Sequence, residues 1–130
     1  MEDKDFIPYQ EALRLEELGF DEYCMECYYY EWKDRGVTHI LLHTPDSYDS
    51  HKGVKAPPYQ QSFKWFREKH NIDSFVKREY ENAKVVGYYF GIDTLNHFDF
   101  IDFRSKLYKT YEEAELACLK QLIKIIKEKQ

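Results

Sequence analysis

Apolar residues recur along the chain at two alternating spacings. Three segments show the three-to-four-residue spacing of an amphipathic helix: residues 8–18, residues 58–69 and the stretch that begins at Thr110. Shorter segments rich in β-branched and aromatic residues predict strands; they are residues 23–32, 37–43, 74–80, 84–92 and 98–103. The order helix, hairpin, helix, hairpin plus strand, helix predicts an α+β fold. We expect three helices to pack on one antiparallel sheet of about five strands.

The last helix has the clearest pattern. Thr110 and Glu113 have the spacing of a capping box, in which the N-cap side chain accepts a hydrogen bond from the backbone three residues later. Apolar residues then cover an arc of about 200° at 100° per residue; they are Ala114, Leu116, Cys118, Leu119, Leu122, Ile123, Ile125 and Ile126. So wide an apolar face predicts that this is the core helix. At the end of the first helix, Gly19 is suited to the position just after the last turn.

Two segments resemble each other at an offset of 50 residues. The segment Pro8-Tyr9-Gln10-Glu11-Ala12-Leu13-Arg14-Leu15 aligns with Pro58-Tyr59-Gln60-Gln61-Ser62-Phe63-Lys64-Trp65, and after a small gap Gly19-Phe20-Asp21 aligns with Asn71-Ile72-Asp73. A duplicated αββ unit closed by the last helix would explain the pattern, since short repeats cannot bury their apolar faces alone. The alternative is that Pro-Tyr-Gln is a favourable helix start that arose independently.

A polar segment separates the first hairpin from the second helix. Residues 44–57 are rich in Pro, Asp, Ser and Gly, which favour turns and loops. A structureless connection of this length is near the limit for a compact domain, so we expect a mobile loop at about residues 44–57. Farther along, the alternation of residues 98–103 slips once, which predicts a bulge or a short edge strand. The chain of 130 residues and 15.8 kDa fits a single domain, residues 1–130.

Charge is distributed unevenly. The net charge is −5; residues 1–31 hold ten acids and two bases, for −8, and the remaining 99 residues hold 14 acids and 17 bases, for +3. Nucleic-acid binders are usually basic overall, so we do not expect nucleic acid as the main partner. No apolar run reaches the roughly 20 residues of a membrane span, and the acidic N-terminus does not resemble a signal peptide. Three cysteines, an odd number, suit a reducing cytoplasm.

One pattern has the spacing of a zinc site. Cys24 and Cys27 precede His39 and His43 as C-x2-C-x11-H-x3-H, one residue short of the usual interval between the pairs in a two-cysteine, two-histidine finger. The surroundings argue against zinc, because a finger carries its histidines on a helix and the run Ile40-Leu41-Leu42 is typical of a strand. The alternative is that the cysteines are small strand hydrophobes.

Two polar groups could carry other chemistry. His51 lies in the long loop among Asp and Ser residues, and a second group with the residue types of a magnesium site consists of Asp93, His97, Asp99 and Asp102. Neither group has the spacing of a known catalytic or calcium-binding motif, and the chain has no glycine-rich nucleotide motif. We therefore expect no catalytic residues and no cofactor.

Aromatic residues are the remaining candidates. They make up 18% of the chain and are concentrated in the predicted strands. One sheet face must form the core, and the other can expose tyrosine, which combines contact area with a polar tip. We name as candidate binding residues Tyr28, Tyr30, Trp32, Trp65 and Tyr88. The alternative is that these rings pack against one another across strands.

The helical segments also carry a family resemblance. The segments Ala56–Lys69 and Thr110–Ile123, together with Pro8–Leu13 and Leu18–Glu22, resemble a family of small uncharacterised proteins encoded by gut Bacteroidetes and by their phages and mobile elements. The resemblance implies an intracellular bacterial or phage setting and an accessory role. It supplies no activity and no site residues.

Three functional hypotheses follow. The first is a non-enzymatic accessory protein of a bacterial mobile element or phage, which binds another protein through an aromatic or acidic surface and can form a homodimer. The second is a nucleic-acid-associated protein that stacks single strands on its aromatic sheet, beside Lys77, Arg78, Lys84 and Arg104. The third is a zinc module or metal-dependent enzyme.

Overall fold

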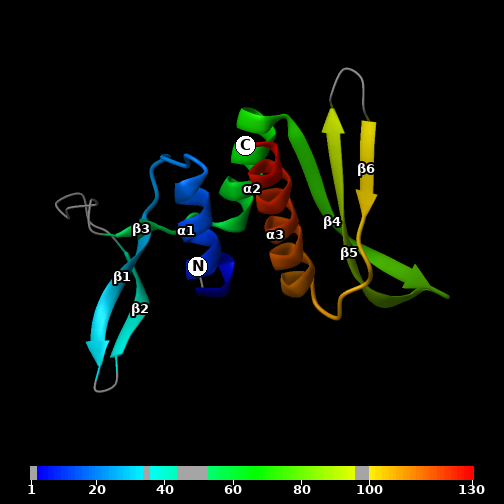
Figure 1. Ribbon diagram of the computed structural model, residues 1–130. Coiled ribbons are helices and arrows are strands. Elements are labelled where there is room, and N and C mark those ends of the chain that lie inside the picture. Colours follow the sequence, from blue (N-terminus) through cyan, green and yellow to red (C-terminus); the bar gives the residue numbers. More distant parts are fainter. Residues whose placement is uncertain (1–2, 34–35, 44–52, 96–99) are drawn as a thin grey trace. The chain divides into compact units, whose positions relative to one another are not determined.

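The computed structural model describes residues 3–33, 36–43, 53–95 and 100–130, without the side chains of residues 30–33, 36–40, 42–43, 95 and 100–102. The chain divides into two compact units, residues 1–60 and 61–130. The three helices are α1 (Tyr9–Glu17), α2 (Tyr59–His70) and α3 (Tyr111–Lys129). The strands are β1 (Glu26–Lys33), β2 (Gly36–His43), β3 (Val54–Lys55), β4 (Ile72–Glu81), β5 (Lys84–Leu95) and β6 (Phe100–Arg104), and a short 3-10 helix covers Asp3–Asp5 (Figure 1).

The predicted α+β class, the three helices and the order of the elements are confirmed. The strands form two antiparallel sheets of three, with the orders β2-β1-β3 and β4-β5-β6, rather than one sheet of about five. The helix α2 lies between the two groups of strands in the sequence, and within each group the strands pair with their sequence neighbours. The expectation that the whole chain forms a single domain stays a prediction.

The first unit is held together by backbone hydrogen bonds to the segment that follows the long loop. In that segment β3 pairs with β1, with Tyr28 opposite Val54, and the backbone N–H of Ile7 donates to the carbonyl of Pro57 at 3.1 Å. The predicted loop, residues 44–57, therefore extends too far toward the C-terminus, because Val54 and Lys55 form the strand β3. β3 pairs with the edge of β1 that β2 does not cover. The β-branched Val54 favours the extended conformation that this pairing requires. Residues 44–52 lie outside the described residues.

The end of α1 has the predicted glycine cap. Gly19 adopts a φ of 102°, and the N–H of Phe20 donates to the carbonyl of Leu15 at 3.0 Å. This is the Schellman arrangement, in which the apolar residue after the glycine packs back on the last turn. Leu15 and Phe20 are both buried.

The two aligned segments have the same local structure. Both helices begin at the tyrosine, and Asn71 after α2 is left-handed at a φ of 55°, as Gly19 is after α1. The next residue is buried in each case (Phe20 and Ile72), and the aspartate that follows is exposed. The sheets differ, because the first strand of the group is central in one unit and the second is central in the other. Duplication of an αββ unit stays a prediction.

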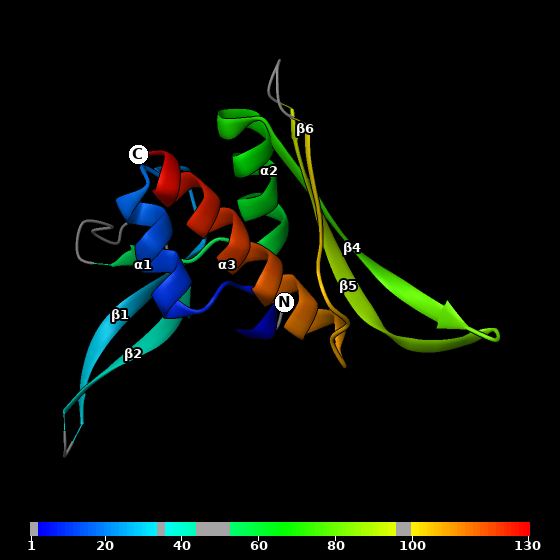
Figure 2. The ribbon, with the colours of Figure 1, turned by 45° about the vertical axis from the view of Figure 1, so that its right-hand side comes forward.

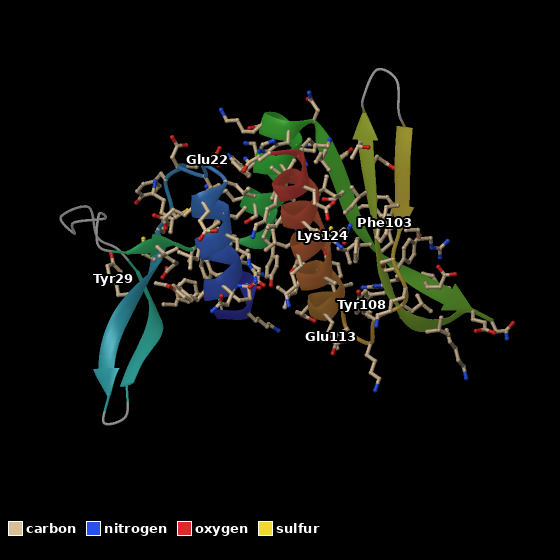
Figure 3. The ribbon with its side chains drawn as sticks, viewed as in Figure 1. Glu22, Tyr29, Phe103, Tyr108, Glu113 and Lys124 are labelled. Carbon is tan, nitrogen blue, oxygen red and sulfur yellow. The ribbon has the colours of Figure 1, made fainter. Side chains whose placement is uncertain are left out.

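In the second unit α3 packs on β4 and β5, as expected of a core helix. The side chain of Thr110 accepts a hydrogen bond from the N–H of Glu113 at 3.1 Å, which confirms the predicted N-cap. On the sheet, Phe90 and Ile92 are buried. The buried apolar side of α3 matches the predicted arc and consists of Ala114, Cys118, Leu119, Leu122, Ile123 and Ile126. Lys124 is exposed on the other side (Figure 3).

The strand β6 is a short edge strand, which confirms one of the two alternatives predicted there. It pairs with residues 91–95 of β5 in a regular register. The bulge lies elsewhere, between β4 and β5, where Glu79 stands opposite Gly87 and Tyr80 opposite Val85, so that Val86 is the extra residue. The turn of this hairpin is formed by Asn82 and Ala83, between the end of β4 and the start of β5.

Candidate protein-binding surface

The hairpin of β4 and β5 extends beyond the rest of its sheet. The strand β6 covers β5 only from Gly91 onward, and one further bridge joins Tyr88 to Tyr108, with N–H···O distances of 2.9 and 2.7 Å. The part between Glu79 and Gly87 projects beyond these contacts (Figure 2). Its side chains therefore receive little cover from β6 or from the segment after it.

The inner face of the sheet, which we define as the face toward α3, is fixed by the ring contacts. Tyr88 meets Tyr111 of α3 edge to face, at 6.1 Å between ring centroids. Phe103 and Tyr108 both stack on Phe90, at 5.7 and 6.2 Å (Figure 3). Because directly opposite residues share a face, the residues opposite these rings also belong to the inner face.

Beyond the start of α3, the inner face becomes an exposed aromatic surface. Arg78 stands opposite Tyr88 and Tyr80 opposite Val85. The side chains of Tyr80, Val85 and Tyr111 are 57%, 46% and 39% exposed. We call this surface the hairpin patch and define it as Arg78, Tyr80, Val85, Tyr88 and Tyr111.

The chemistry of the hairpin patch is that of a protein interface. Tyr and Arg are enriched among residues that contribute most to binding between proteins. A hydrogen bond to Tyr80 raises the pKa of Arg78, and burial, followed by the Glu115 carboxylate, raises the pKa of Tyr111. At neutral pH the patch therefore offers a cation at Arg78 and a neutral phenol at Tyr111 that can donate a hydrogen bond.

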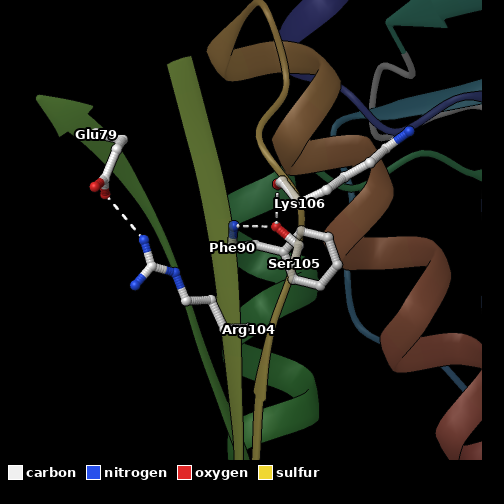
Figure 4. Close-up of polar contacts among 5 residues, drawn as sticks. All are labelled: Glu79, Phe90, Arg104, Ser105 and Lys106. Atoms are coloured by element: carbon white, nitrogen blue, oxygen red, sulfur yellow. Dashed lines mark hydrogen bonds and ion pairs between the residues drawn. The ribbon is translucent and has the colours of Figure 1, made fainter. Parts of the chain in front are cut away.

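The outer face, opposite α3, carries aromatic rings with cations over them. Phe75 and Tyr89 meet edge to face at 6.1 Å between centroids. The Nζ of Lys77 lies 4.7 Å from the Phe75 ring centroid, and the Cζ of Arg104 lies 4.1 Å from that of Tyr89. Arg104 also donates to Glu79 at 3.0 Å (Figure 4). Cations over rings are attracted by the electron density of the ring face, so this surface is held in a defined arrangement.

The segment after β6 is anchored to β5 by a serine. The N–H of Phe90 donates to Ser105 Oγ at 2.8 Å, and the hydroxyl of Ser105 donates to the carbonyl of Lys106 at 2.8 Å (Figure 4). Ser105 also donates its own N–H to the carbonyl of Phe90 at 2.9 Å. These bonds lead the chain from β6 toward Tyr108 and the start of α3, beside the hairpin patch.

The five aromatic residues predicted to bind belong to different elements of the two units. Tyr88 lies in the hairpin patch. Tyr28 lies in the first unit, where its hydroxyl donates to the carbonyl of Ile7 at 2.7 Å and its ring meets that of Tyr9. Trp65 is 3% exposed, so its ring is not accessible to a partner in this structure. The side chains of Tyr30 and Trp32 lie outside the described residues.

The ring of Trp65, together with that of Phe66, packs against His70 at the end of α2. The rings of Trp65 and His70 lie 5.0 Å apart between centroids, and the Phe66 ring lies 6.0 Å from that of His70. Burial, followed by the Lys129 ammonium, lowers the pKa of His70. The imidazole is therefore held mainly in its neutral form near neutral pH.

The predicted zinc ligands are only partly within the described residues. The register places His43 opposite Glu26 and His39 opposite Tyr30, whereas Cys27 stands opposite Leu42. Cys24 lies before β1 and is buried, and burial raises the pKa of its thiol to about 12. Among residues with described side chains, no group of three His, Cys, Asp or Glu is placed to hold a metal ion. The zinc set itself stays a prediction, because the side chains of both histidines lie outside that part.

The other polar candidates fall largely outside the description. His51, His97 and Asp99 are not among the described residues. Asp93 lies in β5, where its backbone stands opposite Asp73 and Asp102. The proposed magnesium group therefore stays a prediction.

Sequence reasoning missed Tyr80 and Val85 as surface residues. Both lie beside charged residues in segments that read as ordinary strands. The lengths of the predicted strands gave a signal. When the third strand of a sheet is shorter than the hairpin beside it, the tip of that hairpin has no neighbouring strand. The bulge at Val86, which decides the face on which Val85 lies, has no comparable signal.

Comparison with family models, curated proteins and solved structures found no match. None of the helices among the described residues has the length and apolar character that a membrane span requires.

Proposed function

We propose that this chain is a non-enzymatic interaction protein that binds another protein through the hairpin patch. The observation that carries the proposal is the exposure of Tyr80, Val85 and Tyr111 beside Arg78, on a hairpin that projects beyond its sheet. A tyrosine exposed by more than half loses contact with water when a partner covers it, and the phenol retains a hydrogen-bonding group. Arg78 adds a charge that can select an acidic or carbonyl-rich partner surface.

The setting that we propose is the cytoplasm of a bacterium, as an accessory protein of a mobile element or phage. The three cysteines are buried and form no disulfide, which fits a reducing compartment. Burial also raises the thiol pKa of Cys118 to about 12, so this residue is not a nucleophile at neutral pH. The mobile-element setting depends on the resemblance of the helical segments alone.

The experiment is a comparison of partners captured from a bacterial host. The test variant carries Tyr80→Ser and Val85→Ser, and the control carries Tyr23→Ser, which changes a tyrosine that is 68% exposed in the first unit. A specific partner should be captured by the wild type and the control and, once purified, should bind the test variant at least about tenfold more weakly. Equal binding to all three proteins would refute a role for the hairpin patch.

A second candidate function is favoured by the outer face. The rings of Phe75 and Tyr89 with Lys77 and Arg104 resemble the combination that stacks bases and contacts phosphates in single-stranded nucleic acid. The ion pair of Arg104 with Glu79 offsets part of the positive charge, and we rank this function second for that reason. Fluorescence anisotropy with a single-stranded oligonucleotide at about 20 mM salt, where phosphate contacts are strongest, tests it. No change in anisotropy would exclude it.

A further inference from the structure

The strand β4 is one of the two edges of its sheet and the longer of them. Within the described part of the chain, the order β4-β5-β6 gives β4 one neighbour only. It is ten residues long, and such an edge presents a row of backbone N–H and C=O groups that can pair with another strand. Natural edges are commonly protected by charged side chains or by proline; β4 has no proline, and its charges are of both signs.

The charges along β4 are instead self-complementary. Lys77 and Glu79 lie on the outer face, two positions apart. A two-fold axis perpendicular to the sheet, passing through the Arg78 position, brings a second β4 alongside in the antiparallel direction. Lys77 of each chain then stands opposite Glu79 of the other, and this happens twice; each Glu79 also keeps its ion pair with Arg104 of its own chain.

The inner face agrees with the same register. Val76 of each chain stands opposite Tyr80 of the other, which joins a β-branched and an aromatic side chain, a favourable cross-strand pair. The two Arg78 side chains meet at the axis, where like charges are unfavourable. Tyr80 follows Arg78 on the same face of β4, so each exposed guanidinium can turn toward Tyr80 of its own chain, and the two groups then point toward opposite ends of the interface.

We infer that the partner of the β4 edge is a second copy of this chain, bound through antiparallel β4–β4 pairing about Arg78. The two sheets then form one continuous sheet of six strands with the order β6-β5-β4-β4-β5-β6. Pairing in this way satisfies the open backbone groups, and the two symmetric ion pairs fix the register, since a slip along the edge places Glu79 opposite Glu79 or Lys77 opposite Lys77. The contact includes Arg78 and Tyr80 of the hairpin patch but not Val85, Tyr88 or Tyr111, and it does not depend on the proposed function of that patch.

Charge exchange tests the register by sedimentation equilibrium between about 1 and 100 µM. Lys77→Glu and Glu79→Lys should each weaken dimerisation by about tenfold or more, because each places like charges opposite one another twice. The double variant with both changes restores opposite charges and should return the dissociation constant to within about threefold of the wild-type value. The control Lys84→Glu makes the same charge change on β5, away from the edge, and should leave the dimer unchanged.

Thermal melts of every variant check that each protein is folded, since these changes are on the surface. A wild-type protein that stays monomeric at about 100 µM overturns the inference, as does a dimer that the double variant fails to restore. The result is independent of partner capture: Val85→Ser should lose the external partner and retain the dimer, whereas Lys77→Glu should lose the dimer with the hairpin patch intact.

Discussion

The turn between β4 and β5 contains a residue in an unfavourable backbone conformation. Asn82 and Ala83 adopt φ values of 50° and 64°, the signature of a two-residue type I′ hairpin turn. Asparagine tolerates this left-handed conformation, but a residue such as alanine loses about 1–2 kcal/mol in it, because Cβ approaches the following carbonyl oxygen. Asn-Gly is the preferred sequence for the turn, so Ala83 stands where glycine is expected.

We predict that Ala83→Gly stabilises the protein. The change removes the backbone cost of about 1–2 kcal/mol. The greater freedom of glycine in the unfolded chain offsets about 0.4–1 kcal/mol of this gain. Ala83 is exposed, so little packing is lost. The net gain in the free energy of unfolding is therefore about 1 kcal/mol, which urea denaturation measures from the shift of the midpoint at constant slope.

The reverse substitution provides a matched comparison. Gly19 adopts a φ of 102°, and a Cβ added to it would meet nothing within 4 Å. Gly19→Ala should therefore destabilise the protein by about 1 kcal/mol or more through the backbone alone. If Ala83→Gly lowered the stability, or if both variants matched the wild type, the assignment of left-handed conformations at these positions would be refuted.

Three further predictions concern the core, a partly buried histidine and the outer face. Leu122→Asp places an unpaired charge at a fully buried position and should abolish cooperative melting, whereas Lys124→Asp on the exposed side should retain it. Burial lowers the pKa of His70, so the unfolded chain takes up a proton first; stability should be complete above about pH 6.5 and fall as the pH drops below it, and His70→Gln should flatten this dependence in melts from pH 5 to 8. A Cβ at Gly91 would collide with the Phe75 ring, so Gly91→Ala should cost about 1–3 kcal/mol and cost less in a Phe75→Ala background, as a double-mutant cycle in urea can show.

The elements were predictable because their signals are local. The hydrogen bond between Thr110 and Glu113 depends on two side chains three residues apart, and the cap at Gly19 depends on one. The wide apolar arc of α3 depends on a periodicity that one helix contains in full. In each case the physical cause and the sequence pattern occupy the same few residues.

The division into two sheets was not predictable in the same way. Strand pairing joins residues that are distant in the sequence, such as Tyr28 and Val54, and β3 has only two residues, too few for a period to be visible. The accessibility of Trp65 and Tyr80 was also undetermined. Both are aromatic residues with a charged neighbour in the sequence, and the packing of neighbouring elements decides that one is buried and the other exposed.

The aromatic residues on the strands of the second unit have different structural roles. Phe90, Phe103 and Tyr108 form a stack on the inner face, where they take part in the packing between sheet and helix. Phe75 covers Gly91, whose missing side chain leaves room for the ring, so this aromatic residue compensates for a glycine. Neither role accounts for Tyr80, which has a polar neighbour and no ring contact among the described side chains. The proposed function depends on this exposed tyrosine, so the hairpin patch, rather than the aromatic content as a whole, is the surface to test.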